Sequence, residues 1–159
     1  MFRISRRLDY GLQLMIALAA SDGDRPVPSA RLSEQLSIPL PFLHQIAHTL
    51  MQSGLIKASP GPRGGLRLNS PADTITVLKI AEVLEGPINI TPGVEVNDTN
   101  CVRQESCATQ SMWDDLQGKI INYMVTHTLD VLVKQSVQLE NFVVPAAETK
   151  RDKTPVSAD

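Results

Sequence analysis

The sequence predicts a mainly α-helical protein, a winged helix-turn-helix domain followed by an additional long helix. Two short apolar helices, separated by a tight break, are expected within residues 29–54. A hairpin follows directly in "IKASPGPRGGLRL", where two prolines and three glycines separate two short apolar runs. A long helix with apolar residues on more than one side comes later, at 111–127. A helix-turn-helix followed by a two-stranded wing is the order of elements in a winged helix.

The first three helices are predicted from apolar periodicity and from the turn residues between them. Residues 4–20 carry apolar side chains at helical spacing, and the cluster "SDGDRPVPS" then ends the pattern. Ser29 is expected to cap a short helix, "ARLSEQL", and the break "SIP" leads into the next helix. Pro39 and Pro41 lie in or before the first turn of that helix, where a missing amide donor costs little. Gly54 is expected just past its end.

The second half of the chain is predicted to contain a long loop and three more helices. Residues 74–86 form an amphipathic helix, and residues 87–106 have no helical period, which is typical of a functional loop. The long helix is expected to begin at Ser111, with Asp114 in a capping-box position. Thr128 is expected to cap a last helix, "LDVLVKQSVQL".

The composition is typical of a cytoplasmic globular protein with unevenly distributed charge. The chain has 159 residues, of which 42% are hydrophobic. No stretch approaches the roughly 20 apolar residues of a membrane helix, and polar residues interrupt the apolar run near the N-terminus, so we expect neither a membrane segment nor a secretion signal. Residues 1–70 carry eight Lys/Arg and four Asp/Glu, whereas residues 71–159 carry seven and thirteen. A basic front half indicates a polyanionic partner, although random scatter of surface charge is the alternative.

No pattern typical of an enzyme is found in the sequence. It contains no Gly-rich phosphate loop, no Ser/His/Asp spacing and no paired catalytic carboxylates in a pocket-like context. His44 and His48 are four residues apart, a spacing that can bind zinc, but no Cys or Glu partner is nearby. We therefore expect a non-catalytic protein.

The second helix of the pair is predicted to enter the major groove of DNA. If Phe42, Leu43 and Ile46 face the core, the outward residues at its front are Leu40, Pro41, His44, Gln45 and His48. A glutamine is suited to bidentate recognition of adenine, and a histidine can donate to a guanine edge. This helix is therefore the predicted source of sequence specificity.

The wing and several arginines are predicted to contact the DNA backbone and minor groove. Arg63 lies at the tip of the hairpin, and Gly64 beside it lets the backbone approach closely. The alternative is that "PGPRGG" is an ordinary solvated turn. Arg6, Arg7 and Arg31 are expected to contact phosphates, which position the protein without reading bases.

The long helix at 111–127 is predicted to form a homodimer. It is apolar on more than one side, and little of the remaining chain is left to cover it. Burial against the same helix of a second copy solves this problem, and two-fold symmetry is the commonest arrangement.

Four segments together resemble the Rrf2 family of bacterial winged-helix transcriptional regulators, which includes IscR-type and NsrR-type iron–sulfur regulators. These segments are "LDYGLQLMIALA", "FLHQIAHTLMQSGLIKASPGPRGGLRL", "ITVLKIAEVLEG" and "CVRQESCATQSMW". The resemblance covers roughly residues 1–140. It implies a homodimer that binds double-stranded DNA at a palindromic operator.

The resemblance also implies a sensor site in the loop. Such sensors place three cysteines there, and take a fourth ligand from a histidine of the loop or from an acidic residue of the partner's first helix. Cys101 and Cys107 match the last two cysteines, whereas the position of the first falls on Glu95 and that of the histidine falls on Gln110. Asp9 matches the acidic ligand.

With two thiolates per chain, oxygen or nitrogen donors must complete the four ligands that a cluster needs. We expect a [2Fe–2S] cluster held by Cys101, Cys107, Asp9 of the partner subunit and Glu95, with His44 or His48 as other donors and [4Fe–4S] as the other cluster type. Mixed ligation makes a cluster easier to lose or oxidise, which suits a sensor of redox state, nitric oxide or iron–sulfur status.

Two alternatives to a cluster remain open at this point. Cys101 and Cys107 could close a disulfide under oxidation, giving a cluster-free redox regulator. The cysteines could also have no role, in a regulator without a cofactor or in an adaptor that binds another protein through its acidic half.

The predicted organisation has four parts. A winged helix-turn-helix DNA-binding domain spans 1–86, and a cysteine-containing sensor loop spans 87–110. The dimerisation helix and the final helix occupy 111–140, and a disordered tail follows at 141–159.

Overall fold

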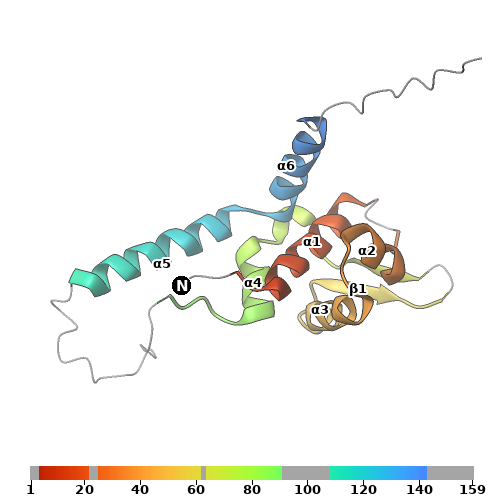
Figure 1. Cartoon of the computed structure of the whole chain (residues 1–159), viewed down its shortest axis with the longest axis horizontal. Helices are drawn as coiled ribbons and strands as arrows, with labels where there is room; N and C mark the ends of the chain where they lie inside the picture. The colour runs from red at the N-terminus through yellow and green to blue at the C-terminus, as the bar shows by residue number, and fades with distance from the viewer. Residues whose placement is uncertain (1–3, 22–24, 62–63, 91–107, 143–159) are drawn as a thin grey trace, which may run out of the picture.

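The computed structural model describes residues 4–21, 25–61, 64–90 and 108–142 (Figure 1). In these ranges the elements follow the predicted order of a winged helix. They are α1 (Arg6–Ala20), α2 (Ser29–Leu36), α3 (Leu40–Gln52), β1 (Ile56–Ser59), β2 (Gly65–Leu68), η1 (Ala72–Thr74), α4 (Val77–Glu85), α5 (Ala108–Thr126) and α6 (Leu129–Phe142). The predicted fold class is confirmed.

The turn between α2 and α3 is held by a small set of hydrogen bonds. Ser37 adopts a left-handed backbone conformation with φ of 53°, and its N–H donates to the carbonyl of Glu34 at 3.3 Å. The N–H of Ile38 donates to the Ser33 carbonyl at 3.1 Å, while Ser33 Oγ donates to the Ile38 carbonyl at 2.6 Å. Ile38 is buried, so this turn is fixed to the core and sets the angle at which α3 leaves it.

Ser29 does not cap α2 as the sequence predicted. The helix begins at Ser29 itself, and Pro28 is the N-cap. The carbonyl of Pro28 accepts the first helical bond, from the N–H of Leu32 at 3.1 Å. Proline fixes its own φ near −65°, so it leads the chain into the helix without a side-chain cap.

Helix α3 ends just before Gly54, as the sequence predicted. Gly54 has φ of 75°, and its N–H donates to the Met51 carbonyl at 2.9 Å. The N–H of Leu55 donates to the Leu50 carbonyl at 3.0 Å. This pair of bonds is the Schellman motif, and it turns the chain directly into β1.

The wing is an antiparallel hairpin to which a third segment adds one bridge. β1 and β2 pair from Ile56 with Leu68 to Ser59 with Gly65. Val27, from the connection between α1 and α2, exchanges two hydrogen bonds with Leu66, at 2.8 and 2.9 Å. A Cβ at Gly65 would collide with the Val27 carbonyl, so only glycine permits this close approach.

One hydrophobic core joins the helices and the wing. Its fully buried side chains include Leu14, Leu43, Ile46, Leu50, Ile80 and Leu129. Gly11 of α1 lies so close to α4 that an added Cβ would overlap Leu84 Cδ1. This contact brings α1 and α4 together, and both helices also pack on α3.

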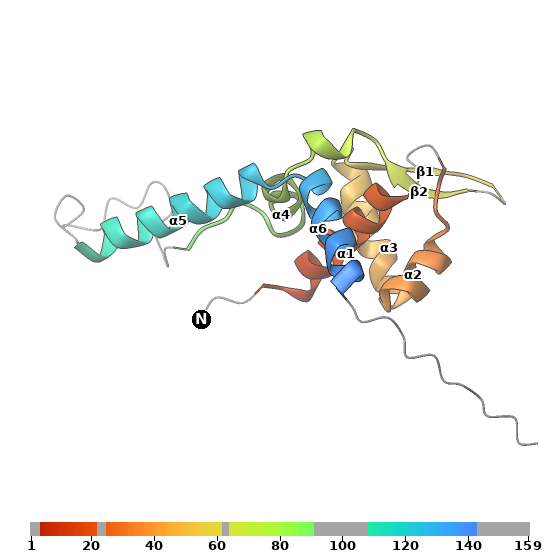
Figure 2. The same cartoon turned by 90° about the horizontal axis from the view of Figure 1, so that it is seen from above.

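The structure places the last helix with the winged head, although the sequence analysis grouped it with the long helix. Thr128 pairs with Thr76 in a short bridge; the N–H of Leu129 donates to the Ile75 carbonyl at 2.9 Å. Leu129 is fully buried, and α6 packs on α1. By contrast, α5 packs on α4 and extends beyond the head as an arm (Figures 1 and 2).

Three predicted helix bounds differ from those observed. α5 begins at Ala108, so Ser111 and Asp114 lie inside the helix and form no capping box. The helix predicted at 74–86 begins later, as α4 at Val77, because Thr76 Oγ1 accepts from the Lys79 N–H at 3.2 Å and caps the helix there; Thr74 is the last residue of η1. α6 continues to Phe142, past the predicted boundary at 140.

Candidate nucleic-acid interface

The front of α3 presents the five side chains that the sequence predicted to face outward. Leu40, Pro41, His44, Gln45 and His48 are all exposed, while Leu43 and Ile46 are buried. Pro39 is the N-cap and Pro41 lies within the first turn, so the helix begins without a side-chain cap. The N–H groups of Phe42 and Leu43 both donate to the Pro39 carbonyl at 2.9 Å, and the two prolines carry no N–H, so the side chains of this helix end, rather than its backbone, are what it offers to DNA.

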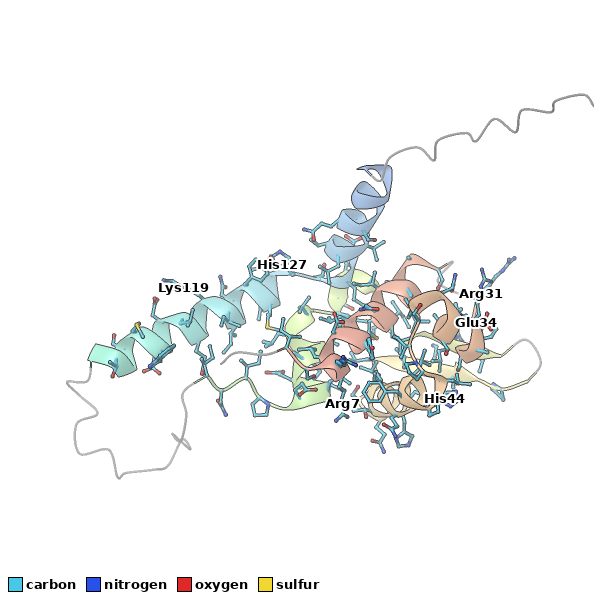
Figure 3. The ribbon with its side chains drawn as sticks, viewed as in Figure 1. Arg7, Arg31, Glu34, His44, Lys119 and His127 are labelled. Atoms are coloured by element: carbon cyan, nitrogen blue, oxygen red, sulfur yellow. The ribbon has the colours of Figure 1, made fainter. Side chains whose placement is uncertain are left out.

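The start of α1 lies against α3 and adds positive charge to this surface. Arg7 Nη2 donates to Thr49 Oγ1 at 3.0 Å, and Thr49 Oγ1 donates to the Gln45 carbonyl at 3.2 Å. Tyr10 of α1 meets Phe42 of α3 edge to face, with ring centroids 5.7 Å apart. Figure 3 shows Arg7 and His44 along the same edge of the molecule. We call the exposed side chains of Arg7, Leu40, Pro41, His44, Gln45 and His48 the recognition face.

Sequence reasoning did not identify Thr49 as part of this surface. The signal available was its position four residues after Gln45, which places both on one side of the helix. The hydrogen bond from Arg7 joins residues 42 positions apart, and no local pattern indicates it.

The other predicted phosphate contacts are not gathered with the recognition face to the same extent. Arg6 is exposed on α1. Arg31 is exposed on α2 and lies apart from Arg7 and His44 in Figure 3. It lines a pocket of about 580 Å³ that also includes Arg25.

Gly64 in the wing has a structural reason to be glycine. Its N–H donates to the Gly61 carbonyl at 2.8 Å, and a Cβ there would collide with the Ser59 carbonyl. Any side chain at this position would therefore disturb the hairpin. Arg63, the predicted contact at the tip, lies outside the described residues.

The alternative donors His44 and His48 lie on α3, and of the predicted ligands Cys101, Cys107, Glu95 and Asp9 the structure describes only Asp9. Its carboxylate is exposed on the first turn of α1 and accepts a hydrogen bond from Gln13 Nε2 at 3.0 Å. Cys101, Cys107 and Glu95 lie outside the described residues. Within the part of the chain that the structure describes, no three His, Cys, Asp or Glu side chains come together at one point.

The exposed carboxylate of Asp9 fits the role of a ligand supplied to another chain. The start of α1 also lies beside the end of α4, since Ser5 Oγ donates to Glu85 Oε1 at 2.8 Å. The segment that contains the cysteines follows α4 in the sequence. The described chain that leads toward it ends at Ile90, whose N–H donates to Gln117 Oε1 of α5 at 3.0 Å.

Helix α5 carries exposed apolar side chains. Met112 is 53% exposed and Tyr123 is 64% exposed. Trp113, Leu116 and Met124 are half-buried, and no side chain described on this helix is fully buried. None of the helices in the described ranges has the length and apolarity needed to cross a membrane.

Comparison with known proteins links this geometry to a family. The profile of the Rrf2 family, described as iron-dependent transcriptional regulator, matches residues 4–135. The transcriptional regulator IscR of Pectobacterium atrosepticum is 30% identical over 151 residues, covering 94% of this chain and 90% of that protein.

Two solved structures are similar in fold. The global cysteine regulator CymR of B. subtilis superposes with a TM-score of 0.70 at 28% identity, covering 85% of this chain and 98% of the other. IscR of T. potens superposes with a TM-score of 0.70 at 27% identity, covering 87% and 91%.

Proposed function

The chain belongs to the Rrf2 family of transcriptional regulators, and from this premise we propose that it is a homodimer that binds a palindromic DNA operator and changes its operator affinity through an iron–sulfur cluster. The observation that carries the DNA-binding part is the recognition face. It combines an exposed helix front, two histidines, a glutamine and an arginine held against that helix.

The recognition face is suited to reading bases in the major groove. Gln45 offers the amide that pairs with the N6 and N7 atoms of adenine, and His44 is placed to donate to a guanine. Arg7 adds a phosphate contact beside the groove, and Arg6, Arg31, Arg63 and Gly64 are proposed as further backbone contacts. The α2–α3 turn and the Arg7–Thr49 bond keep the helix front in a fixed orientation.

The exposed apolar side chains of α5 are the reason for proposing a dimer. At about 1.5 Å per residue, the 19 residues of α5 make a helix of about 28 Å, and its exposed apolar side chains need a cover. The same helix of a second copy covers them symmetrically. Two recognition helices related in this way read half-sites about 34 Å apart.

The proposed sensor combines Cys101, Cys107 and Glu95 of one protomer with Asp9 of the other. When bound, an iron–sulfur cluster supplies a centre that reacts with oxidants and nitric oxide. The hydrogen bond from Gln13 orients the Asp9 carboxylate, as second-layer contacts commonly do for ligands. Asp9 is two residues from Arg7, so a ligand held there acts on the helix end that contacts α3. A coupling of roughly 1–3 kcal/mol is enough to change operator affinity 5–150-fold.

The test is anaerobic purification followed by visible absorption, iron analysis and titration of a fluorescent operator duplex. We expect a coloured protein whose operator affinity changes when the cluster is removed. A colourless, iron-free protein that binds the operator fully would contradict the cluster. A monomeric protein, or one that binds no promoter fragment at low ionic strength, would contradict the regulator as a whole.

The second candidate is a cluster-free regulator that senses oxidation through Cys101 and Cys107. Its support is the similarity to CymR of Staphylococcus aureus, for which the structure of an oxidised form is known. In that case oxidant closes a disulfide and changes operator affinity in iron-free protein, and thiol labelling before and after oxidation measures the loss of two thiols. A protein-binding adaptor, the third candidate, would show no salt-dependent binding to duplex DNA.

A further inference from the structure

Leu40 is an exposed apolar side chain at the front of the recognition helix. It is the first residue of α3 and is 36% exposed. Within the helix-turn-helix at 29–54, all of which the structure describes, no other leucine, isoleucine, methionine or aromatic side chain is exposed. In helix-turn-helix proteins the N-terminal residues of the recognition helix contact the base edges. An apolar side chain at this place is therefore matched by an apolar group in the major groove.

The outward side chains of α3 form two neighbouring rows, because side chains four residues apart lie above one another on a helix. The rows are Leu40, His44 and His48 in one and Pro41, Gln45 and Thr49 in the other. Leu40 thus lies one turn before His44, and Pro41 lies one turn before Gln45. The two apolar residues belong to the same surface as the polar side chains proposed to read bases.

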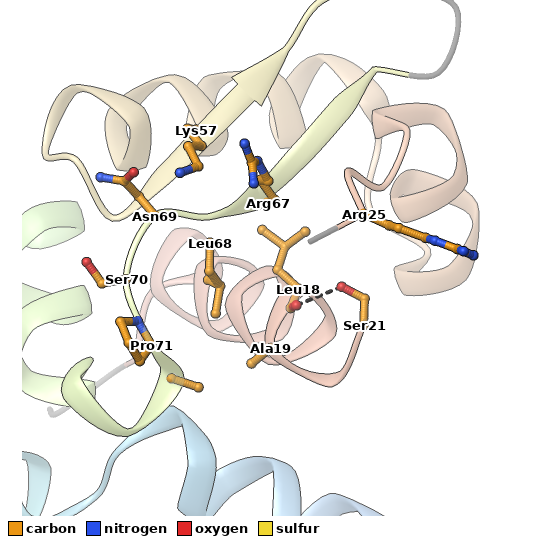
Figure 4. Close-up of a pocket in the computed structure, with 11 residues that line it drawn as sticks. Leu18, Ala19, Ser21, Arg25, Lys57, Arg67, Leu68, Asn69, Ser70 and Pro71 are labelled. Carbon is orange, nitrogen blue, oxygen red and sulfur yellow. Dashed lines mark hydrogen bonds between the residues drawn. The ribbon is translucent and has the colours of Figure 1, made fainter. Parts of the chain in front are cut away.

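This surface is separate from the two pockets of the winged head. The pocket between the wing, the end of α1 and η1 has a volume of about 670 Å³ and is lined by residues such as Leu18 and Pro71 (Figure 4). The pocket that contains Arg31 has a volume of about 580 Å³. Neither is lined by a residue of α3. Leu40 therefore contributes its apolar surface to the recognition face and to neither pocket.

The side chains of α3 suit thymine better than cytosine. The helix contains no Asp or Glu, and a carboxylate is the side chain that accepts a hydrogen bond from the N4 amino group of cytosine. Asp9 and Glu34 belong to α1 and α2. Thymine presents an O4 acceptor and a C5-methyl group in the major groove. These two groups match a histidine donor and an apolar side chain in one row.

We propose that Leu40, with Pro41 beside it, packs on the C5-methyl group of a thymine in each operator half-site and creates a preference for thymine over cytosine there. This inference rests on the proposed DNA binding, and it names a base that is read by neither Gln45 nor His44. Burial of one methyl group changes the affinity about fourfold, equal to about 0.8 kcal/mol. Two half-sites that act independently give a change of about 15-fold.

The test uses the duplex that the full-length, anaerobically purified protein selects from a randomised library. Each thymine and its symmetry mate are replaced by deoxyuridine, which lacks the methyl group and keeps the base pair. We expect one pair of thymines at which this change lowers the affinity by the amount given above. In Leu40→Ala the two duplexes should bind equally. Leu40→Met, which keeps an apolar side chain, and Gln52→Ala, at the exposed far end of α3, should retain the difference.

A second comparison adds the methyl group to the other pyrimidine. Cytosine at the same two positions should lower the affinity, and 5-methylcytosine should recover the part that depends on the methyl group. The recovery should occur in the unchanged protein and not in Leu40→Ala. Because cytosine and 5-methylcytosine form the same base pair, this comparison isolates the methyl contact from the hydrogen bonds.

Three results would overturn this inference and leave the proposed operator binding in place. The first is a selected duplex in which no replacement of thymine by deoxyuridine lowers the affinity. The second is a loss on replacement that is as large in Leu40→Ala as in the unchanged protein, and the third is a loss that Gln52→Ala abolishes equally. Failure to select any duplex contradicts the proposed operator binding and this inference together.

Discussion

Arg7 of α1 donates from Nη2 to Thr49 Oγ1 of α3 at 3.0 Å, and this bond makes the start of α1 part of the recognition face. Thr49 extends the link to the Gln45 carbonyl at 3.2 Å. A cation and a candidate base-reading residue are therefore connected through one hydroxyl group. The link joins the two helices that the proposed function uses. Helix α1 carries Asp9, the proposed cluster ligand, and α3 carries the residues proposed to read DNA bases.

Charge and geometry at this link can be separated by two variants. Arg7→Gln should lower DNA affinity and reduce the slope of log affinity against log salt by about 1, because one phosphate contact is lost. Thr49→Val keeps the charge but removes the hydrogen bond, worth about 0.5–1.5 kcal/mol, so the slope should stay at its original value. Duplex titrations at several salt concentrations measure both. An unchanged slope in Arg7→Gln would remove this residue from the interface.

Gln45→Ala should reduce discrimination between the operator and a scrambled duplex. A bidentate amide–adenine contact contributes about 1–3 kcal/mol of specificity, so the ratio of the two affinities should fall by about 5–150-fold. Gln52→Ala is the matched control, because Gln52 is exposed at the far end of the same helix. Equal effects of the two substitutions would argue against base reading by Gln45.

Replacing glycine by alanine should have opposite effects on stability at two positions: Gly11, where α1 packs closely on α4, and Gly118 on α5. Gly11→Ala should destabilise the protein by about 1–3 kcal/mol, because the new Cβ overlaps Leu84 Cδ1. Gly118→Ala on α5 meets no atom within 4 Å and should stabilise the helix by about 0.5–1 kcal/mol. Urea unfolding at one fixed protein concentration gives both values. A neutral Gly11→Ala would mean that the two helices separate at little cost.

Met112→Glu should weaken the dimer. Met112 is 53% exposed. In an apolar interface between two α5 helices, a buried carboxylate loses its hydration, whereas the buried methionine side chain stabilises the interface. Ser111→Glu adds the same charge at the neighbouring exposed position and serves as the control. Sedimentation velocity over a concentration series should show a larger monomer fraction for the Met112 variant alone. An unchanged dimer would place the interface elsewhere.

Asp9→Asn should lower the iron content of anaerobically purified protein and change its visible spectrum, because the amide is a poorer ligand than the carboxylate. Removing the supporting hydrogen bond with Gln13→Ala should give a smaller loss, about tenfold in affinity for the metal centre. Asp73→Asn makes the same chemical change at an exposed carboxylate of η1 and should have no effect. Full iron retention in Asp9→Asn would exclude this residue as a ligand.

Much of the winged helix could be predicted from the sequence because its signals are local. Pro39 and Gly54 mark the two ends of α3, and both act within one helical turn. The outward set of α3 followed from helical periodicity, which also identified Leu43 and Ile46 as core residues. The predicted N-cap at Ser29 was wrong by one residue, because the preceding proline took that position.

Other features depend on partners that are distant in sequence. Val27 joins the wing through Leu66, Leu129 enters the core through Ile75, and Arg7 reaches Thr49. No periodicity or turn motif encodes such pairs. The predictions for Cys101, Cys107, Glu95 and Arg63 stay predictions, since these residues lie outside the described ranges.

By itself, the sequence determined the order of the elements, the helix that faces outward and the family to which the chain belongs. The tertiary structure decided that α6 is part of the head, that the start of α1 completes the recognition face, and that Val27 joins the wing. The physical reason is the range of the interactions: capping and periodicity act over a few residues, whereas packing and cross-strand pairing act only once distant segments meet.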